Sequence, residues 1–149
     1  MSIPIFFRVD GLPKAQGRPR AFVRGTHAGV FNPKTADDWK ALIAATALRH
    51  RPAAPIEGPV DISIDFYFPR PGRLKRKRDP KGLIWHTAKP DRDNLDKAVL
   101  DILKQIGFVA DDAAVCQGMI RKFYCTMDGS ANDRPGALIT IRTLPLEIF

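Results

Sequence analysis

Two aspartates stand two residues apart at the start of a helical pattern, and a third follows the end of that pattern. Asp91 and Asp93 lie where the chain enters the pattern, Pro90 holds the preceding chain extended, and Asp112 follows shortly after Gly107. Carboxylates that converge on one point repel one another unless a cation joins them. Hard oxygen ligands of this kind suit Mg²⁺, with Mn²⁺ as a substitute, and such ions complete their shells with water and substrate phosphate. The three aspartates are therefore candidate metal ligands.

A cation held by these aspartates would serve phosphodiester hydrolysis. It would polarise the scissile phosphate and help to generate the attacking hydroxide, and a second ion would stabilise the leaving oxygen. Lys97 lies four residues after Asp93, on the same helical face, where it is placed to neutralise charge that develops in the transition state. The pattern predicts as catalytic residues Asp91, Asp93, Lys97 and Asp112.

Each of these residues also has an ordinary structural explanation. An aspartate at a helix start is commonly a cap, and Lys97 with Asp101 has the spacing of a surface ion pair. A calcium-binding EF-hand loop is excluded, because Leu95 stands where the third ligand belongs and Asp96 where glycine is required. These residues therefore indicate a metal-dependent site only when they are considered together.

The combination forms a composite motif. It reads D-x-D-N-L-x-K-x-x-L-D-x-L, then a helix-ending G-F, then D-D-x-x-V. The matching residues are Asp91, Asp93, Asn94, Leu95, Lys97, Leu100, Asp101, Leu103, Gly107, Phe108, Asp111, Asp112 and Val115. This motif resembles the RusA family of Holliday-junction resolvases. An N-terminal strand, a Pro/Arg-rich loop and a first helix extend the resemblance more loosely.

The resemblance implies an Mg²⁺-dependent homodimer that nicks four-way DNA junctions symmetrically. It implies that the metal ligands are Asp91, Asp93 and Asp112 and that the catalytic lysine is Lys97. Asp111 matches a neighbouring acid of less certain role. The segment from Arg70 to Lys89 departs from the family, because it is longer and more basic than expected, and this leaves the natural DNA structure open.

The overall charge also points to nucleic acid. The 149 residues include 24 Lys and Arg against 16 Asp and Glu, a net charge of +8, and the sequence pI is about 9.9. Such a charge on a small domain attracts polyanions. No apolar run approaches the ~20 residues that cross a bilayer, and the N-terminus lacks the features of a signal peptide. We expect a cytoplasmic protein with no membrane association and no small-molecule cofactor.

Residues 70–90 concentrate this charge. They hold eight Lys and Arg against one acid, so the segment is predicted to be a mobile surface loop. Together with a Pro/Arg-rich loop at 13–22, it supplies candidate phosphate contacts of low sequence preference. These are Arg18, Arg20, Arg73, Lys75, Arg76, Lys77, Arg78 and Lys89, with Arg24 as a further candidate. Trp85 is a candidate either for stacking on an unpaired base or for anchoring the loop.

Hydrophobic periodicity defines the elements that must position these residues. Strands are predicted at 3–9, 60–68, 115–125 and 137–142, and helices at 35–50 and 94–106. Thr35 is expected to cap the first helix, on whose apolar side Trp39 lies, and Gly107 to end the second. The order β-α-β-α-β-β predicts one small α/β (α+β) domain, residues 1–149, with a mixed sheet and two helices.

Two cysteines and the length of the second helix add further expectations. Cys116 and Cys125 are nine residues apart and point to opposite faces of a strand, so both are expected to be free thiols. The second helix is about 20 Å long, and the six residues from Gly107 to Asp112 span that length only when extended. Asp112 therefore completes either the site of its own chain or that of a partner in a two-fold dimer.

Three classes of function remain open. The first is an endonuclease of branched DNA that acts in recombination and repair. The second is a nuclease for flaps, forks or RNA that uses the same acids. The third is a non-catalytic basic DNA-binding protein, in which the acids are caps. Dependence on a divalent ion separates the first two from the third.

Overall fold

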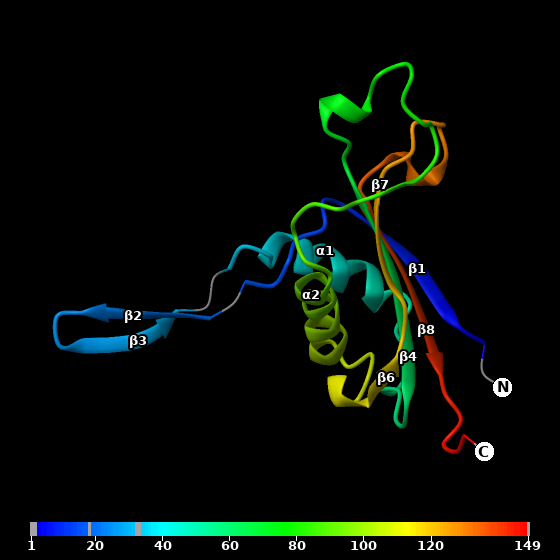
Figure 1. Cartoon of the computed structure of the whole chain (residues 1–149). Coiled ribbons are helices and arrows are strands. Elements are labelled where there is room, and N and C mark those ends of the chain that lie inside the picture. The colour runs from blue at the N-terminus through cyan, green and yellow to red at the C-terminus, as the bar shows by residue number, and fades with distance from the viewer. Residues whose placement is uncertain (1–2, 18, 32–33, 149) are drawn as a thin grey trace.

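The computed structural model describes residues 3–17, 19–31 and 34–148, and it forms a mixed sheet with two helices on one face (Figure 1). The strands are β1 (Ile5–Asp10), β2 (Arg20–Arg24), β3 (His27–Phe31), β4 (Val60–Phe68), β5 (Ile84–Trp85), β6 (Val115–Gln117), β7 (Ile120–Tyr124) and β8 (Gly136–Thr143). The helices are α1 (Asp37–Leu48) and α2 (Arg92–Gln105), with short 3₁₀ turns η1 (Gly72–Leu74), η2 (Asp112–Ala114) and η3 (Ala131–Asp133).

The main sheet has the strand order β1-β8-β4-β7-β5, and β6 also pairs with β4. β8 runs antiparallel to both β1 and β4, whereas β6 and β7 run parallel to β4. β5 closes the edge as a short antiparallel partner of β7. The predicted small domain with a mixed sheet and two helices is therefore confirmed. Among the described residues, no helix is long and apolar enough to cross a membrane.

β4 supplies the centre of the core, as its alternating sequence predicts. Its alternating side chains Val60, Ile62, Ile64, Phe66 and Phe68 are buried on the face that α1 and α2 cover. α1 contributes Trp39, Ile43 and Ala47 to this core, so the prediction for Trp39 is confirmed. On the helix-free face, Asp65 accepts two hydrogen bonds from the guanidinium of Arg121, both at 2.7 Å.

α2 carries the acidic motif, and its two ends are well defined. The helix buries Leu95, Ala98, Val99, Ile102 and Leu103. It ends at Gly107, whose φ of 75° requires a residue without a side chain, and its amide donates to the Lys104 carbonyl at 3.0 Å. The prediction that Gly107 ends the helix is confirmed.

The prediction that Thr35 caps the first helix is wrong. α1 begins at Asp37, and Ala36 occupies the cap position without a side-chain hydrogen bond. The Asp38 carboxylate instead accepts a hydrogen bond from the Trp39 amide at 2.8 Å and pairs with the Lys14 ammonium at 2.6 Å. An acid inside the first turn therefore satisfies the helix start, which a threonine before it was expected to do.

The strand predicted at 115–125 is interrupted. Gly118 separates β6 from β7 and lies directly against the Ile62 carbonyl, where a side chain would not fit. The register between β4 and β6 shifts within β6, between Val115 and Gln117, and β6 and β7 pair with β4 as separate strands. Cys116 is exposed and Cys125 is buried, and both are free as predicted.

The sequence predicts an irregular loop over residues 13–22, but the end of this segment forms a strand. Arg20 begins β2, which pairs antiparallel with β3 to form a two-stranded sheet of its own. This hairpin projects away from the helices and the main sheet (Figure 1). The prediction failed because Pro13, Gly17 and Pro19 precede the strand and obscure the short alternation that follows them.

The basic segment 70–90 is also more ordered than its charge predicts. Arg70 is only 5% exposed, and its guanidinium donates hydrogen bonds to the carbonyls of Cys125, Leu74, Pro80 and Gly82 at 2.6–2.9 Å. One buried cation therefore holds residues 74–82 in a turn and connects this turn to Cys125, just after β7. The cations beyond it project from the end of the sheet.

Candidate active site at the start of helix α2

The acid pair lies at the exposed start of α2. Asp91 is the cap residue, with extended backbone angles, and its side chain makes no capping hydrogen bond. Asp93 is the second residue of the helix and is also exposed. Asp91 therefore occupies the cap position without acting as a side-chain cap. Both carboxylates face solvent at the positive end of the helix dipole, which favours negative charge.

Two lysines surround Asp91. The Lys89 ammonium lies 3.2 Å from each carboxylate oxygen of Asp91. Lys122, on β7, donates a hydrogen bond to the Ala88 carbonyl at 2.7 Å, three residues before Asp91. Burial lowers the pKa of Lys122, Lys89 acts in the same direction, and Asp91 opposes both. The acids therefore lie in a cationic setting that also suits a phosphate.

Lys97 lies one helical turn after Asp93. Its ammonium is 3.8 Å from Asp101, and Lys40 of α1 approaches the same aspartate at 3.8 Å. The i,i+4 ion pair that the sequence allows is therefore present, although it is long. Lys97 remains mostly exposed, so its ammonium can reach a ligand at the helix start.

Asp112 lies at the opposite end of α2. It begins η2, and Lys104 in the last turn of α2 is 3.7 Å from Asp112 and 3.6 Å from Asp111. Asp111 caps η2 by accepting a hydrogen bond from the Ala113 amide at 3.2 Å. Figure 1 shows α2 running from the side that carries the 70–83 projection to the side where η2 lies.

One chain therefore does not bring the three predicted metal ligands together. Eleven residues separate Asp93 from Lys104 along the helix, which corresponds to about 16 Å. No group of three or more His, Cys, Asp or Glu side chains suited to a metal ion occurs among the described residues. The structure assembles Asp91, Asp93 and Lys97 and leaves Asp112 a helix length away.

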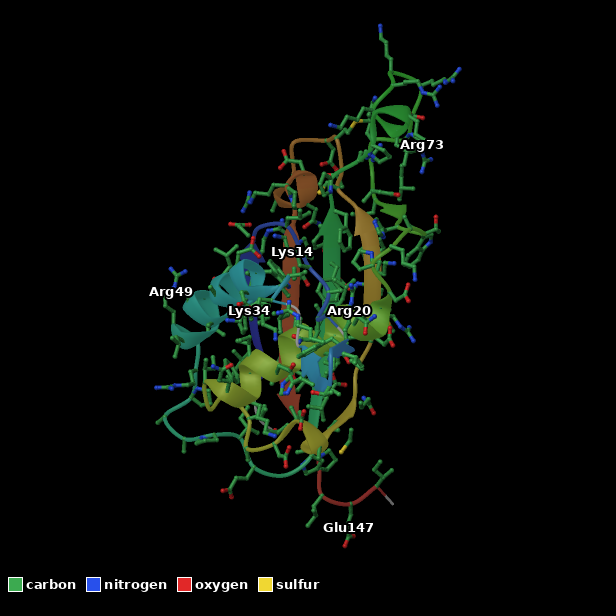
Figure 2. All side chains as sticks on the ribbon, turned by 90° about the vertical axis from the view of Figure 1, so that its left-hand side faces the viewer. Lys14, Arg20, Lys34, Arg49, Arg73 and Glu147 are labelled. Atoms are coloured by element: carbon green, nitrogen blue, oxygen red, sulfur yellow. The ribbon has the colours of Figure 1, made fainter. Side chains whose placement is uncertain are left out.

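The predicted phosphate contacts that the structure describes lie in three places: on the β2–β3 hairpin, on the 70–83 projection and beside the acid pair. Arg18 lies outside the described residues. Arg20 is exposed on the hairpin, and Arg73 is exposed on the 70–83 projection, well apart from it in Figure 2. Arg76 is partly engaged by the Arg73 carbonyl and by Asp79. Among the other predicted contacts on this projection, Lys75, Lys77 and Arg78 are exposed. Lys89 instead belongs to the acid pair.

Trp85 and His86 point to opposite faces of the sheet edge. Trp85 is 63% exposed and stacks on Phe123 with ring centroids 4.8 Å apart. His86 is buried between Phe68 and Tyr124, at 4.1 and 4.7 Å. Burial and the nearby Lys122 lower the pKa of His86, so it is neutral at pH 7. Trp85 keeps an open aromatic surface, whereas His86 is part of the packing.

Two residues near the acids were missed by sequence reasoning. Lys122 lies on the inward face of β7 together with Ile120 and Tyr124. A lysine between two apolar residues on the same strand face was the sequence feature that could have identified it. Asp96 lies one turn after Arg92 and is half-buried, and this burial raises the pKa of its carboxyl. It lines a shallow depression with Leu100 and Gln117. No sequence pattern distinguishes Asp96 from an ordinary surface acid.

Comparisons with known proteins agree with the motif. Residues 10–142 match the family described as Endodeoxyribonuclease RusA. A protein of Bacillus subtilis (strain 168), described as uncharacterized protein YqaN, is 37% identical over 125 residues, which cover 80% of this chain and 87% of that protein. The family match extends from the end of β1 to β8 and so includes both ends of α2. The chain therefore belongs to the RusA family of Holliday-junction-resolving endodeoxyribonucleases.

Proposed function

We propose that this protein is a homodimeric endonuclease that resolves four-way DNA junctions by Mg²⁺-dependent hydrolysis and serves DNA recombination and repair. The observation that carries the proposal is the exposed pair Asp91 and Asp93 at the start of α2, with Lys97 one turn along the helix. The free thiols of Cys116 and Cys125 suit a reducing compartment such as the cytoplasm.

The donor set at this end of α2 fits a hard divalent cation. Two exposed carboxylates are present, and Mg²⁺ is commonly held by one or two carboxylates together with water and substrate phosphate. Asp91 is paired with Lys89 at 3.2 Å, an ammonium group that a metal ion would replace. When bound, the ion would polarise the scissile phosphate and favour attack by water. Mn²⁺ offers the same oxygen preference.

The lysines supply the remaining charge. Lys97 is exposed and one turn from Asp93, so it can approach the phosphate oxygens as negative charge develops during cleavage. Lys122 holds the Ala88 carbonyl and thereby the segment that leads into Asp91. We assign Lys97 to transition-state stabilisation and Lys122 to the positioning of Asp91.

A third carboxylate is best supplied by a second subunit. Asp112 lies beside Lys104, about 16 Å along α2 from Asp93. If two α2 helices pack antiparallel about a two-fold axis near the middle of the helix, the end with Asp112 of each meets the end with Asp93 of the other. Such a dimer has two equivalent sites, which the paired nicks of a junction require.

DNA binding would rest on charge distributed around these sites. The exposed cations Arg73, Lys75, Lys77 and Arg78 project from the end of the sheet, and Arg20 projects on the hairpin. Contacts of this kind fix the position of the DNA and carry little sequence information. Trp85 adds an exposed aromatic surface for an unpaired base.

The decisive experiment compares DNA shapes and metals. A synthetic four-way junction, a flap, a fork, an RNA junction and a linear duplex are incubated with the protein in Mg²⁺, Mn²⁺ or EDTA. We expect paired nicks in the four-way junction with either metal and none in EDTA. Preferred cutting of flaps, forks or RNA would assign that structure as the substrate in place of the four-way junction. Binding without cutting under every condition would contradict nuclease function.

A further inference from the structure

The β2–β3 hairpin has two chemically different sides. Side chains alternate along a strand, and partners across a hairpin share a side. Arg20, Phe22 and Arg24 therefore lie on one side, with His27 opposite Arg24 and Gly29 opposite Phe22. The other side consists of small apolar residues, Ala21, Val23, Ala28 and Val30. The hairpin is thus a ribbon with one basic-aromatic side and one apolar side.

The turn and a glycine give the basic side its shape. Gly25 has a φ of 60° in the two-residue turn, which sets Arg24 and His27 directly opposite each other. The Phe22 ring lies over Gly29, where a side chain on that residue would come within 2.7 Å of it. The ring therefore covers the centre of the ribbon, and the arginines flank it at both ends.

Both arginines of this ribbon are exposed. Neither Arg20 nor Arg24 forms an ion pair with any residue that the structure describes. The hairpin also stands apart from the body (Figure 1), with Val23 and Val30 at 73% and 67% exposure. A solitary two-stranded hairpin is at best marginally stable in water, so a ligand that covers it would also stabilise it.

The segment that leads into the hairpin is held beside the acid pair at Gln16, four residues before β2 begins. The Gln16 amide donates a hydrogen bond to the Asn94 carbonyl at 3.0 Å, one residue after Asp93. Figure 2 looks along the hairpin from the side to which it projects, with Arg20 of β2 labelled. Strands of five residues extend about 16 Å from the base of the hairpin.

We propose that the β2–β3 hairpin is a DNA-binding arm whose basic side lies on the phosphates of the duplex next to the cleaved position. The inference rests on the proposed function, and it adds the element that grips the duplex and the place where it does so. A two-stranded ribbon fits the major groove of DNA, and Arg20 and Arg24 then reach the flanking phosphates. At about 3.4 Å per base pair, the tip lies about five base pairs from the scissile phosphate.

Charge and area favour DNA over a protein partner. The basic side complements phosphate, and the sequence from residue 20 to residue 31 contains no acidic residue. The apolar side offers two alanines and two valines, whereas a stable protein interface buries about 800 Å² on each partner. Four small side chains provide far less than that.

Three double variants test the assignment by binding alone, in EDTA. Arg20→Ala/Arg24→Ala removes the basic side. Arg49→Ala/Arg142→Ala removes the same charge from exposed positions outside the hairpin and serves as the matched control. Val23→Thr/Val30→Thr changes the apolar side and keeps β-branched residues. The first variant should lose about tenfold or more in junction affinity and about two units of the salt slope, because two phosphate contacts are lost.

The control and the apolar-side variant should stay within about threefold of the wild type in affinity, at unchanged molecular mass. Equal losses in the first two variants would overturn the arm, because net charge would then explain both. A change of mass or binding in the valine variant alone would show instead that a second copy of the chain covers the hairpin. If the wild type fails to bind a junction, the proposed function itself fails, and this outcome is distinct from failure of the arm.

A tethered cleavage reagent locates the tip directly. Thr26→Cys in a Cys116→Ser background carries Fe-EDTA at the turn, since Cys125 is buried. Cuts centred about five base pairs from the scissile phosphate, on one duplex arm, are expected from the length of the strands. Cuts spread evenly over all arms would contradict a fixed arm.

Discussion

The two ends of helix α2 present the same pair of residue types, an aspartate beside a lysine. At the first end, Asp91 and Asp93 lie among lysines, and Lys89 pairs with Asp91 at 3.2 Å. At the second end, Asp112 pairs with Lys104 at 3.7 Å. In each case a flexible ammonium group occupies carboxylate oxygens that could bind a metal ion. One chain therefore holds its candidate metal ligands in two groups, separated by the length of the helix between them.

The ends also differ in how the chain reaches them. The first is entered from the long basic segment, whose turn is gathered by Arg70 and whose last residues are held by Lys122. At the second end, the chain leaves the helix at Gly107 and reaches η2 within a few residues. The first end therefore depends on distant contacts, whereas the second is set locally by the helix cap.

The largest expected effect is the loss of cleavage when either end loses a carboxylate. Asp91→Asn, Asp93→Asn and Asp112→Asn should each slow junction cutting by about 10³-fold or more, because a metal contact is worth several kcal/mol in the transition state. Binding measured in EDTA should stay equal or tighten, since negative charge facing phosphate is removed. Single-turnover rates in Mg²⁺ and affinities in EDTA provide the measurements.

Chelation is the companion test of the same comparison. EDTA should abolish cutting by the wild type, and added Mg²⁺ or Mn²⁺ should restore it. Full activity in EDTA would contradict a metal-dependent mechanism. Full activity of any one asparagine variant would contradict a catalytic role for that aspartate.

Mixing two inactive variants tests whether the ends belong to one site. With a shared site, a mixed dimer of Asp93→Asn and Asp112→Asn has one doubly mutated site and one intact site. Random exchange of subunits makes about half of the dimers mixed, so nicking should recover to about a quarter of the wild-type level. These dimers should nick one strand without completing resolution, which a nicking gel distinguishes from paired cuts.

The result depends on subunit exchange, which differently tagged subunits can demonstrate. If mixed dimers are isolated and remain inactive, each site is built within one chain. Asp112 would then have to move along the length of α2 when DNA binds.

The sequence predicts the parts of this fold that follow from periodicity. The alternation in β4 and the apolar stripe of α2 identify both elements, and Gly107 marks the end of the helix. In the segment 70–90, composition predicts repulsion between cations but does not reveal that one of them, Arg70, is buried against four carbonyls. The hairpin was missed because short strands without a core leave a weak pattern.

The candidate site was only partly accessible from the sequence. The spacing of Asp91, Asp93 and Lys97 within one helix places them together with no further information. The position of Asp112 depends on how the chain turns after α2, and the presence of Lys122 depends on the pairing of β7 with β5. Both are contacts between distant segments, which local patterns do not encode.

Lys97 provides a further test of the difference between the two ends of α2, because it lies near the first end only. Lys97→Ala should lower the cleavage rate by about 10²-fold with little change in junction affinity, since its charge acts on the transition state. Lys104→Ala, which removes the corresponding lysine of the second end, serves as the control and should have a much smaller effect. Equal losses of rate and affinity in Lys97→Ala would make Lys97 a simple phosphate contact.

Lys122 tests whether the first end needs its distant support. Lys122→Met removes the 2.7 Å hydrogen bond to Ala88 and should slow cleavage about tenfold by loosening Asp91, with partial rescue in Lys122→Arg. The Mg²⁺ concentration for half-maximal rate should rise in Lys122→Met. An unchanged Mg²⁺ requirement, with lower thermal stability alone, would assign Lys122 to folding.

The smallest expected effect separates two neighbouring acids at the second end. Asp111 caps η2 by accepting a hydrogen bond from the Ala113 amide at 3.2 Å. Asparagine accepts the same bond, so Asp111→Asn should leave cleavage within about threefold of the wild type, whereas Asp112→Asn abolishes it. Parallel rate measurements on the two variants, with thermal unfolding as a check on the fold, decide the assignment. If Asp111→Asn is as inactive as Asp112→Asn while remaining folded, Asp111 is itself part of the metal-binding half-site, and the second end contributes two carboxylates to match the two at the first.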